Sequence, residues 1–305
     1  MVWLAGVASS YQQAAAIFER VGQRHIPASS IWRQVKQAGE KLQAYVEHQQ
    51  ELVSVERVKL PAPGKDHFQQ KGVSMDGGMV HIRGEGWKEI KVGAVFDVVR
   101  RPERDPVTGE WATCAGASHI AYTAVLGGVE AFSAALWKLA LEADIPAAAR
   151  SSVTADGAPW IWNVADDLFP DSSQIVDWYH ASQHLAAAAH ALHPQDEKKA
   201  RRWFQFQKPH LFQGSIHLIT RPLDVAGLSE HSQYFHTHKR RMQYLEFREE
   251  GFPIGSGTVE SGIKQFKTRL TGPGMRWSRS GAEHMLTIRC AILSDTFDAL
   301  WQAAA

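Results

Sequence analysis

The hydrophobic pattern of this chain changes its period along the sequence, and this change limits the folds that the chain can adopt. From residue 72 to residue 127, apolar residues alternate with polar ones at the period of two that is typical of β-strands. From residue 129 to residue 185, stretches with helical spacing alternate with short apolar runs. Strands able to pair antiparallel, followed by strand–helix alternation, predict an α/β fold with a mixed sheet flanked by helices.

Turn residues divide this region into its expected elements. Asp76-Gly77-Gly78 has the composition of a tight hairpin turn, so we expect one strand to end near Asp76 and a second to follow Gly78. The remaining expected elements are a strand over 89–101, a loop over 102–116, a strand over 117–127, a helix over 129–145, a strand ending on Asp156, a helix from Pro159, a strand from Ser173 that leads into a helix, and helices over 255–270 and 281–300.

Four segments follow from these patterns. Residues 1–60 are expected to be helical, with a break at Gly22–Arg24 and exposed Arg33 and Lys36 on the second helix, which fits either a DNA-binding helix-turn-helix or an ordinary helical hairpin. Pro61-Ala-Pro-Gly64 is the clearest linker. Residues 61–184 form the first part of the sheet domain, 185–252 a helical insertion without strands, and 253–305 the C-terminal helices that complete the domain.

Composition excludes several classes of protein. The 305-residue chain has a net charge of +1, but residues 239–289 contain ten Lys/Arg and five Asp/Glu, a local charge of +5 that suits a phosphate-binding face or a solvated basic helix. The two cysteines, Cys114 and Cys290, form no CxxC pair, which disfavours a disulfide framework or a cysteine zinc site and fits a reducing cytoplasm. We expect neither a signal peptide nor a transmembrane helix.

Three acidic residues stand where functional groups gather in α/β folds. Asp76 and Asp156 are each expected at a strand end and are each followed by glycine, and Glu260 falls in the first turn of the 255–270 helix. Three carboxylates that converge need a counter-ion, and Mg²⁺ or Mn²⁺ takes such oxygen ligands. Two ions about 4 Å apart could activate the attacking oxygen and stabilise the leaving oxygen of a phosphodiester.

Basic residues follow the third carboxylate at helical spacing. Lys264 and Lys267 lie one and two turns after Glu260 on the same face of the helix. An ordinary Glu–Lys pair on a solvated face would have the same spacing. The alternative is a DNA backbone held by these lysines and by the basic residues after them, which are Arg269, Arg276 and Arg279.

At these residues the chain resembles a known family. Asp76, Asp156 and Glu260 resemble the DDE catalytic triad of transposases built on the ribonuclease H-like fold. The surrounding motifs, SMDGG, TADGAPWIW, VDWYHASQHL and GSGTVESGIKQFKTRLTGPGMRWSRSGAEHMLTIR, resemble bacterial insertion-sequence transposases of the ISKra kind. The resemblance covers roughly residues 72–289, and more weakly the N-terminal helix pair.

What the resemblance implies is a metal-dependent nuclease and strand transferase with a helical insertion between the second Asp and the Glu. It implies double-stranded DNA as partner, both element ends and target, an assembly of at least two copies on DNA, no membrane, and a place in the bacterial cytoplasm with the nucleoid. The segment from Asp177 to His180 also matches the D-x-x-H element of Mutator-like transposases. His180 would then contact the scissile phosphate or hold an active-site carboxylate. The alternative is a purely structural role for His180, as a packed histidine at a strand end.

Other functions remain as alternatives. Such transposases usually carry a longer N-terminal region, so the chain could be an inactive or truncated remnant that only binds DNA. A two-carboxylate glycosidase is disfavoured by the lysines beside Glu260. His180 and His184 have the i, i+4 spacing of a zinc pair but lack the glutamate of HExxH. Trp203, beside two arginines in the insertion, could stack on an unpaired base or belong to the core.

Overall fold

The structure is a computed structural model that describes residues 1–55, 70–105 and 107–304. Its strands are β1 (Gln70–Ile82), β2 (Gly86–Arg104), β3 (Trp111–Val125), β4 (Arg150–Ala155) and β5 (Ser173–Val176). Its helices are α1 (Val2–Val7), α2 (Tyr11–Gly22), α3 (Ala28–Val55), α4 (Val129–Glu142), α5 (Pro159–Leu168), α6 (Trp178–Leu192), α7 (Glu197–Phe212), α8 (Ile216–Val225), α9 (Ser229–His238), α10 (Tyr244–Glu249), α11 (Gly257–Leu270), α12 (Arg279–Leu293) and α13 (Phe297–Ala303), with short 3-10 turns at Ile145–Ala147 and Lys239–Arg241.

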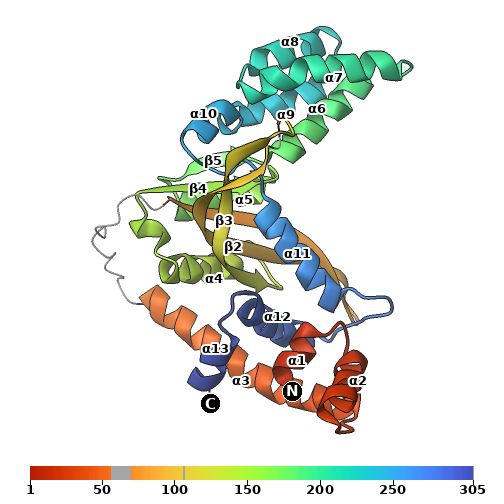
Figure 1. Ribbon diagram of the computed structural model, residues 1–305, viewed down its shortest axis with the longest axis vertical. Helices are drawn as coiled ribbons and strands as arrows, with labels where there is room; N and C mark the ends of the chain where they lie inside the picture. The colour runs from red at the N-terminus through yellow and green to blue at the C-terminus, as the bar shows by residue number, and fades with distance from the viewer. Residues whose placement is uncertain (56–69, 106, 305) are drawn as a thin grey trace.

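The five strands form one mixed sheet in the order β3-β2-β1-β4-β5. β1, β2 and β3 pair antiparallel, whereas β4 pairs parallel to β1 and β5 pairs parallel to β4. Figure 1 shows helices α6 to α10 beyond one end of the sheet, and α1 to α3 with α12 and α13 beyond the other. The prediction of a mixed α/β sheet flanked by helices is confirmed.

The predicted hairpin at Gly77-Gly78 is wrong, because β1 continues through both glycines to Ile82. The chain reverses after Ile82, and Gly84 and Gly86 take the positive φ angles, +77° and +75°, that this turn requires. Gly78 lies inside the strand, where a Cβ atom would come 3.3 Å from Ile90 on β2 and 3.4 Å from Ile263 on α11.

Two further boundaries differ from the prediction. The expected loop over 102–116 is mostly strand, because β2 runs to Arg104 and β3 begins at Trp111. The expected helix over 281–300 is two helices, since α12 ends at Leu293 and α13 begins at Phe297. β1 pairs with β2 only as far as Asp97, so residues 98–104 and 111–117 form a two-stranded extension of the sheet, called here the β2–β3 arm.

The sheet is covered on both faces. Val73 and Met75 of β1 point into a core shared with α4 and α5, whereas Val80 and Ile82 point into a second core shared with α3, α11 and α12. This alternation is the period of two in the sequence. Asp76 has the same parity as Val80 and Ile82, and it therefore lies on the face that α11 covers.

The N-terminal helices pack on the domain through one face of α3. Ile31, Val35 and Leu42 are buried in the second core together with residues of α11 and α12, whereas Arg33 and Lys36 are exposed. This arrangement accounts for the apolar stripe of α3 without assigning a DNA-reading role to it. The linker predicted at Pro61–Gly64 lies outside the described residues.

Residues 185–252 contain helices and turns, and no strand is assigned in this range. The segment begins and ends at one place, because the Trp178 N–H donates to the Ile254 carbonyl over 2.9 Å. Within the described part of the chain, no helix has both the length and the apolar character that a membrane span requires.

Candidate functional site

The register of the parallel strands brings Asp76 and Asp156 to one level of the sheet. Ser74 of β1 pairs with Thr154 of β4, and each aspartate lies two residues beyond this pair. Asp156 directly follows β4, as predicted, but Asp76 lies within β1, which extends past the end of β4 at this point. The expectation that Asp76 ends a strand is therefore wrong, although Asp76 does lie just beyond the end of the β1–β4 pairing.

Asp76 is electrostatically coupled to the rest of the site. Burial is the largest cause that raises the pKa of its carboxyl to about 6, and the charges of Asp156 and Glu260 act in the same direction. The Gly77 N–H, which donates to Asp76 Oδ1 over 2.6 Å, lowers the pKa, and so does His180. The charges that act on Asp76 thus come from the residue that follows β4, from α6 and from α11.

Asp156 is held by the turn that leads from β4 into α5. Its Oδ1 accepts the backbone N–H of Ala158 over 3.0 Å, which fixes the side chain at the strand end. Gly157 has a φ angle of +111°, a conformation that L-residues rarely adopt. Pro159 then begins α5, as predicted. The Asp-Gly-x-Pro sequence thus turns the chain sharply and leaves one carboxylate oxygen of Asp156 free of this turn.

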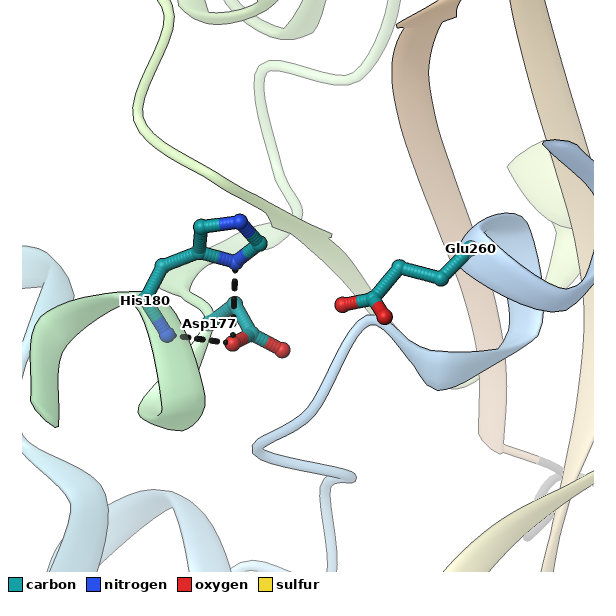
Figure 2. A group of neighbouring side chains, drawn as sticks. All are labelled: Asp177, His180 and Glu260. Carbon is teal, nitrogen blue, oxygen red and sulfur yellow. Dashed lines mark hydrogen bonds and ion pairs between the residues drawn. The ribbon is translucent and has the colours of Figure 1, made fainter. Parts of the chain in front are cut away.

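Glu260 lies in the first turn of α11 and points toward Asp177 and His180 (Figure 2). Its Oε1 accepts a hydrogen bond from Ser256 Oγ over 3.2 Å. The i, i+4 ion pair with Lys264 that the sequence allowed does not form in the described part of the chain. The simple explanation of this helix as a solvated Glu–Lys surface is thereby weakened.

Asp177 connects His180 to the segment that precedes α11. Its Oδ1 accepts the His180 backbone N–H over 2.8 Å and lies 3.1 Å from His180 Nδ1 (Figure 2). Its Oδ2 accepts the Ser256 N–H. Burial alone would raise the pKa of Asp177, but hydrogen bonds from His180 and Ser256 hold it below its usual value. The hydrogen bond to Asp177 raises the pKa of His180 against the effect of burial, and the negative charges of Asp156 and Glu260 add to the rise.

Among the described residues, one group has three potential metal-ligand atoms within 4.8 Å of one another, and it consists of Asp177, His180 and Glu260. This set differs from the predicted trio of Asp76, Asp156 and Glu260. Asp177 is completely buried, and both its oxygens already accept hydrogen bonds. These contacts give Asp177 a positioning role, whereas Asp76, Asp156 and Glu260 each have one carboxylate oxygen in a hydrogen bond among the described residues.

One predicted phosphate contact is wrong. Arg269 is only 2% exposed, its Nε donates to the Ala5 carbonyl over 2.9 Å, and its guanidinium lies against the rings of Tyr11 and Trp277. Arg269 ties α11 to the N-terminal helices and cannot reach a ligand in solvent. A positive charge in the sequence does not reveal burial of this kind, because the aromatic partners come from distant segments.

The other predicted basic residues are at the surface. Arg279 forms ion pairs with Glu85 and Glu283, and Lys36 lies 3.9 Å from Glu40. The remaining ones are exposed and have no ion pair among the described residues: Arg33, Lys264, Lys267 and Arg276. Lys264 and Lys267 project from the helix that carries Glu260, and they remain the basic residues of the predicted set with the most direct link to the site.

The alternative zinc pair of His180 and His184 gains no support. The His184 ring stacks on Tyr234 with a centroid separation of 3.6 Å, and His184 is not part of the group of close ligand atoms. Trp203 is half-buried and packs against the core of the helical segment, which accounts for it without a base. The sequence analysis did not predict the role of Ser256, which contacts both Asp177 and Glu260. The only signal for it in the sequence is its position directly before the helix that carries Glu260.

Comparison of the chain with protein-family models and with curated proteins found no match.

Proposed function

We propose that the chain is a metal-dependent enzyme that cleaves and joins DNA phosphodiesters in the manner of a DDE transposase. One observation supports the proposal: the charges of Asp156 and Glu260, residues far from Asp76 in the sequence, act on the Asp76 carboxyl, and the register of β1 and β4 brings Asp76 and Asp156 to one level of the sheet. The strand order, with three antiparallel strands followed by two parallel ones, is compatible with the ribonuclease H-like fold that the sequence motifs resemble.

The chemistry of these donors fits a hard divalent cation. No lysine or arginine in the described chain forms an ion pair with any of the three carboxylates, and the positive charge of His180 lowers the pKa of Asp76. Asp76, Asp156 and Glu260 would hold Mg²⁺ or Mn²⁺ through oxygen atoms, as these ions prefer. A bound pair of such ions supplies an activated nucleophile and stabilises the leaving oxygen.

His180 is oriented for a role beside the cation. Its Nδ1 is occupied by Asp177, so its Nε2 is the nitrogen free to meet a substrate. Because the pKa of His180 is raised, the ring carries a positive charge over a wider pH range and can donate a hydrogen bond to a phosphate oxygen. Ser256 connects the two side chains, because its hydroxyl donates to Glu260 and its backbone N–H donates to Asp177, which in turn orients His180.

The partners follow from the reaction. Double-stranded DNA carrying element ends, and then target DNA, would lie over the carboxylates, with phosphates against Lys264, Lys267 and Arg276. Pairing two ends calls for at least two copies of the chain on DNA. Such an enzyme would work in the bacterial cytoplasm, on the nucleoid.

The test is cleavage of a plasmid that contains the genomic DNA flanking this gene on both sides. We expect nicking that requires Mg²⁺ or Mn²⁺ and falls by at least about 100-fold in Asp156→Asn. Asp167→Asn is the matched control, since Asp167 is exposed on α5 and forms no ion pair in the described chain. Binding of the flanking DNA without any nicking would instead favour the alternative, an inactive remnant that only binds DNA.

A further inference from the structure

A cleft of about 760 Å³ lies against the segment that leads into α11, and Asp76, Asp156 and Glu260 are not among its lining residues. One wall is the β2–β3 arm, and the other is formed by α10, residues 251–258 and the first turns of α11. The tip of the arm is fastened to the helical segment, because Asp105 forms an ion pair with Arg248 and the Val107 carbonyl accepts a hydrogen bond from Lys208 over 3.2 Å. The cleft is therefore bounded on both sides by anchored elements.

The lining of this cleft is strongly basic. Four arginines contribute to it, Arg100, Arg101, Arg104 and Arg248, against the single carboxylate of Glu103. Arg248 is neutralised by Asp105, and Arg101 lies 3.4 Å from Glu103.

Two of these arginines retain an unbalanced charge. Arg100 and Arg104 are exposed and have no ion pair within the described chain. Arg104 donates to the Gly109 carbonyl and lies over the Trp111 ring, so its guanidinium is held in place. The Arg100 guanidinium lies close to Gly251, where a Cβ atom would come within 2.8 Å of it. Fixed cations without counter-ions attract an anionic ligand.

One end of the cleft adjoins the backbone next to the candidate site. Gly255 and Tyr179 line the cleft, and a Cβ atom on Gly255 would be 3.6 Å from the Tyr179 ring and 3.7 Å from the Asp177 carboxylate. Tyr179 stands between Asp177 and His180 in sequence, and its ring is half exposed. A single segment of backbone, residues 253–257, thus separates the cleft from the groups that position Glu260.

We propose that this cleft binds an unpaired segment of a DNA strand next to the scissile phosphate, with phosphates on Arg100 and Arg104 and one base stacked on Tyr179. The inference rests on the proposed function. The volume is that of an ordinary ligand pocket, roughly 300–1,000 Å³, which suits a few nucleotides and is too small for a stretch of duplex. A basic groove combined with an exposed aromatic ring is the combination by which proteins hold single strands without reading their sequence.

The test is binding in EDTA, so that no metal or cleavage is needed. Fluorescein-labelled oligothymidylate and a labelled hairpin duplex are titrated with the full chain, and fluorescence anisotropy is measured at several salt concentrations. For the Arg100→Ala, Arg104→Ala double variant we expect at least about tenfold weaker binding of the single strand, and a salt slope reduced by about 1.4 for two lost phosphate contacts. Duplex affinity should change by less than about twofold.

Matched variants keep this test specific. Arg201→Ala with Arg202→Ala removes two exposed arginines from α7, away from the cleft, and should leave single-strand affinity unchanged. Tyr179→Ala should weaken single-strand binding about 5- to 150-fold, whereas Tyr179→Phe keeps the ring and should bind as the wild type does. Unchanged single-strand affinity in the cleft variant, an equal loss in the α7 variant, or an equal loss of duplex affinity would each overturn the proposal.

The experiments distinguish an error in the proposed cleft ligand from an error in the proposed catalytic function. Metal-dependent nicking that is lost in Asp156→Asn, together with single-strand binding that ignores Arg100 and Arg104, would refute the cleft and leave the enzyme intact. Single-strand binding that depends on both arginines, without nicking under any metal condition, would support the cleft and refute the catalytic proposal.

Discussion

Replacing Asp76 by asparagine is expected to make the metal-free protein more stable at neutral pH, although it removes a proposed metal ligand. Burial and the nearby carboxylates raise the pKa of Asp76 from 3.8 to about 6. At about 1.4 kcal/mol for each tenfold change, ionising Asp76 in the folded protein costs up to about 3 kcal/mol, an upper bound because solvent reaches part of the carboxyl. Asparagine carries no charge and keeps an oxygen that can accept the Gly77 N–H.

The sign of the pH dependence follows from proton binding. Between pH 3.8 and about 6, the unfolded chain has released the Asp76 proton while the folded chain retains it. The wild-type protein therefore loses stability as pH rises through this window, and Asp76→Asn does not. The stability gap between the two proteins should be about half open near pH 5 and fully open above about pH 7.

Urea unfolding in EDTA at about pH 5 and at about pH 7.5 measures this gap. Asp97→Asn on the adjacent strand is the control of opposite sign. Burial alone would raise the pKa of Asp97, but hydrogen bonds from Lys71 and His119 hold it below its usual value, so this variant should lose stability at neutral pH. If Asp76→Asn were no more stable than the wild type at the higher pH, neither the burial of Asp76 nor the nearby negative charges would raise its pKa as described.

A second arm of the same experiment concerns the cation. Mn²⁺ should raise the unfolding temperature of the wild-type protein, because a ligand that binds only the folded state stabilises it. Asp76→Asn should show little or no such increase. An equal increase in both proteins would mean that Asp76 is not a ligand.

Three further outcomes are expected. Asp177→Asn should lower the pKa of His180, because an amide lacks the charge that stabilises the imidazolium, and an unchanged pKa in an NMR titration would contradict the positioning role. Gly157→Ala should destabilise the fold by about 1–3 kcal/mol because of its positive φ, whereas Gly128→Ala, where a Cβ atom meets nothing, should change stability little in the same urea assay. Arg269→Lys should reduce stability by about 1–3 kcal/mol, since lysine cannot reproduce the stacked guanidinium, and loss of DNA binding at unchanged stability would refute its buried role.

The sheet and the positions of two acids could be predicted from local patterns. Strand alternation is visible in the residues themselves, and the Asp-Gly-x-Pro sequence at Asp156 specifies a turn wherever it occurs. The glycines after Asp76 were harder to interpret, because the sequence Asp76-Gly77-Gly78 is typical of a hairpin turn. Their actual environment is a strand beneath α11, and only the packing of a helix from the far end of the chain distinguishes the two cases.

The remaining features depend on contacts between distant segments. Asp177 is a buried support because Ser256 reaches it across the sheet edge, and Arg269 is buried because Ala5, Tyr11 and Trp277 surround it. The cleft was not predicted, because the range 102–116 has the prolines and glycines of a loop in the sequence, whereas residues 102–104 and 111–116 belong to paired strands. Charge and spacing alone therefore located the acids but not the residues that hold them.

The Trp178–Ile254 hydrogen bond has a consequence for how the chain can vary. The helical segment leaves the sheet and returns to it at one point, and Asp177 closes this junction by binding the Ser256 N–H. A segment whose two ends meet closes as its own loop, and the entropy of closing a loop grows only slowly with its length. Changes in helix length within the segment should therefore leave Glu260 in register with the sheet as long as they spare this junction, His180 in α6, and the contacts of Lys208 and Arg248 with the β2–β3 arm.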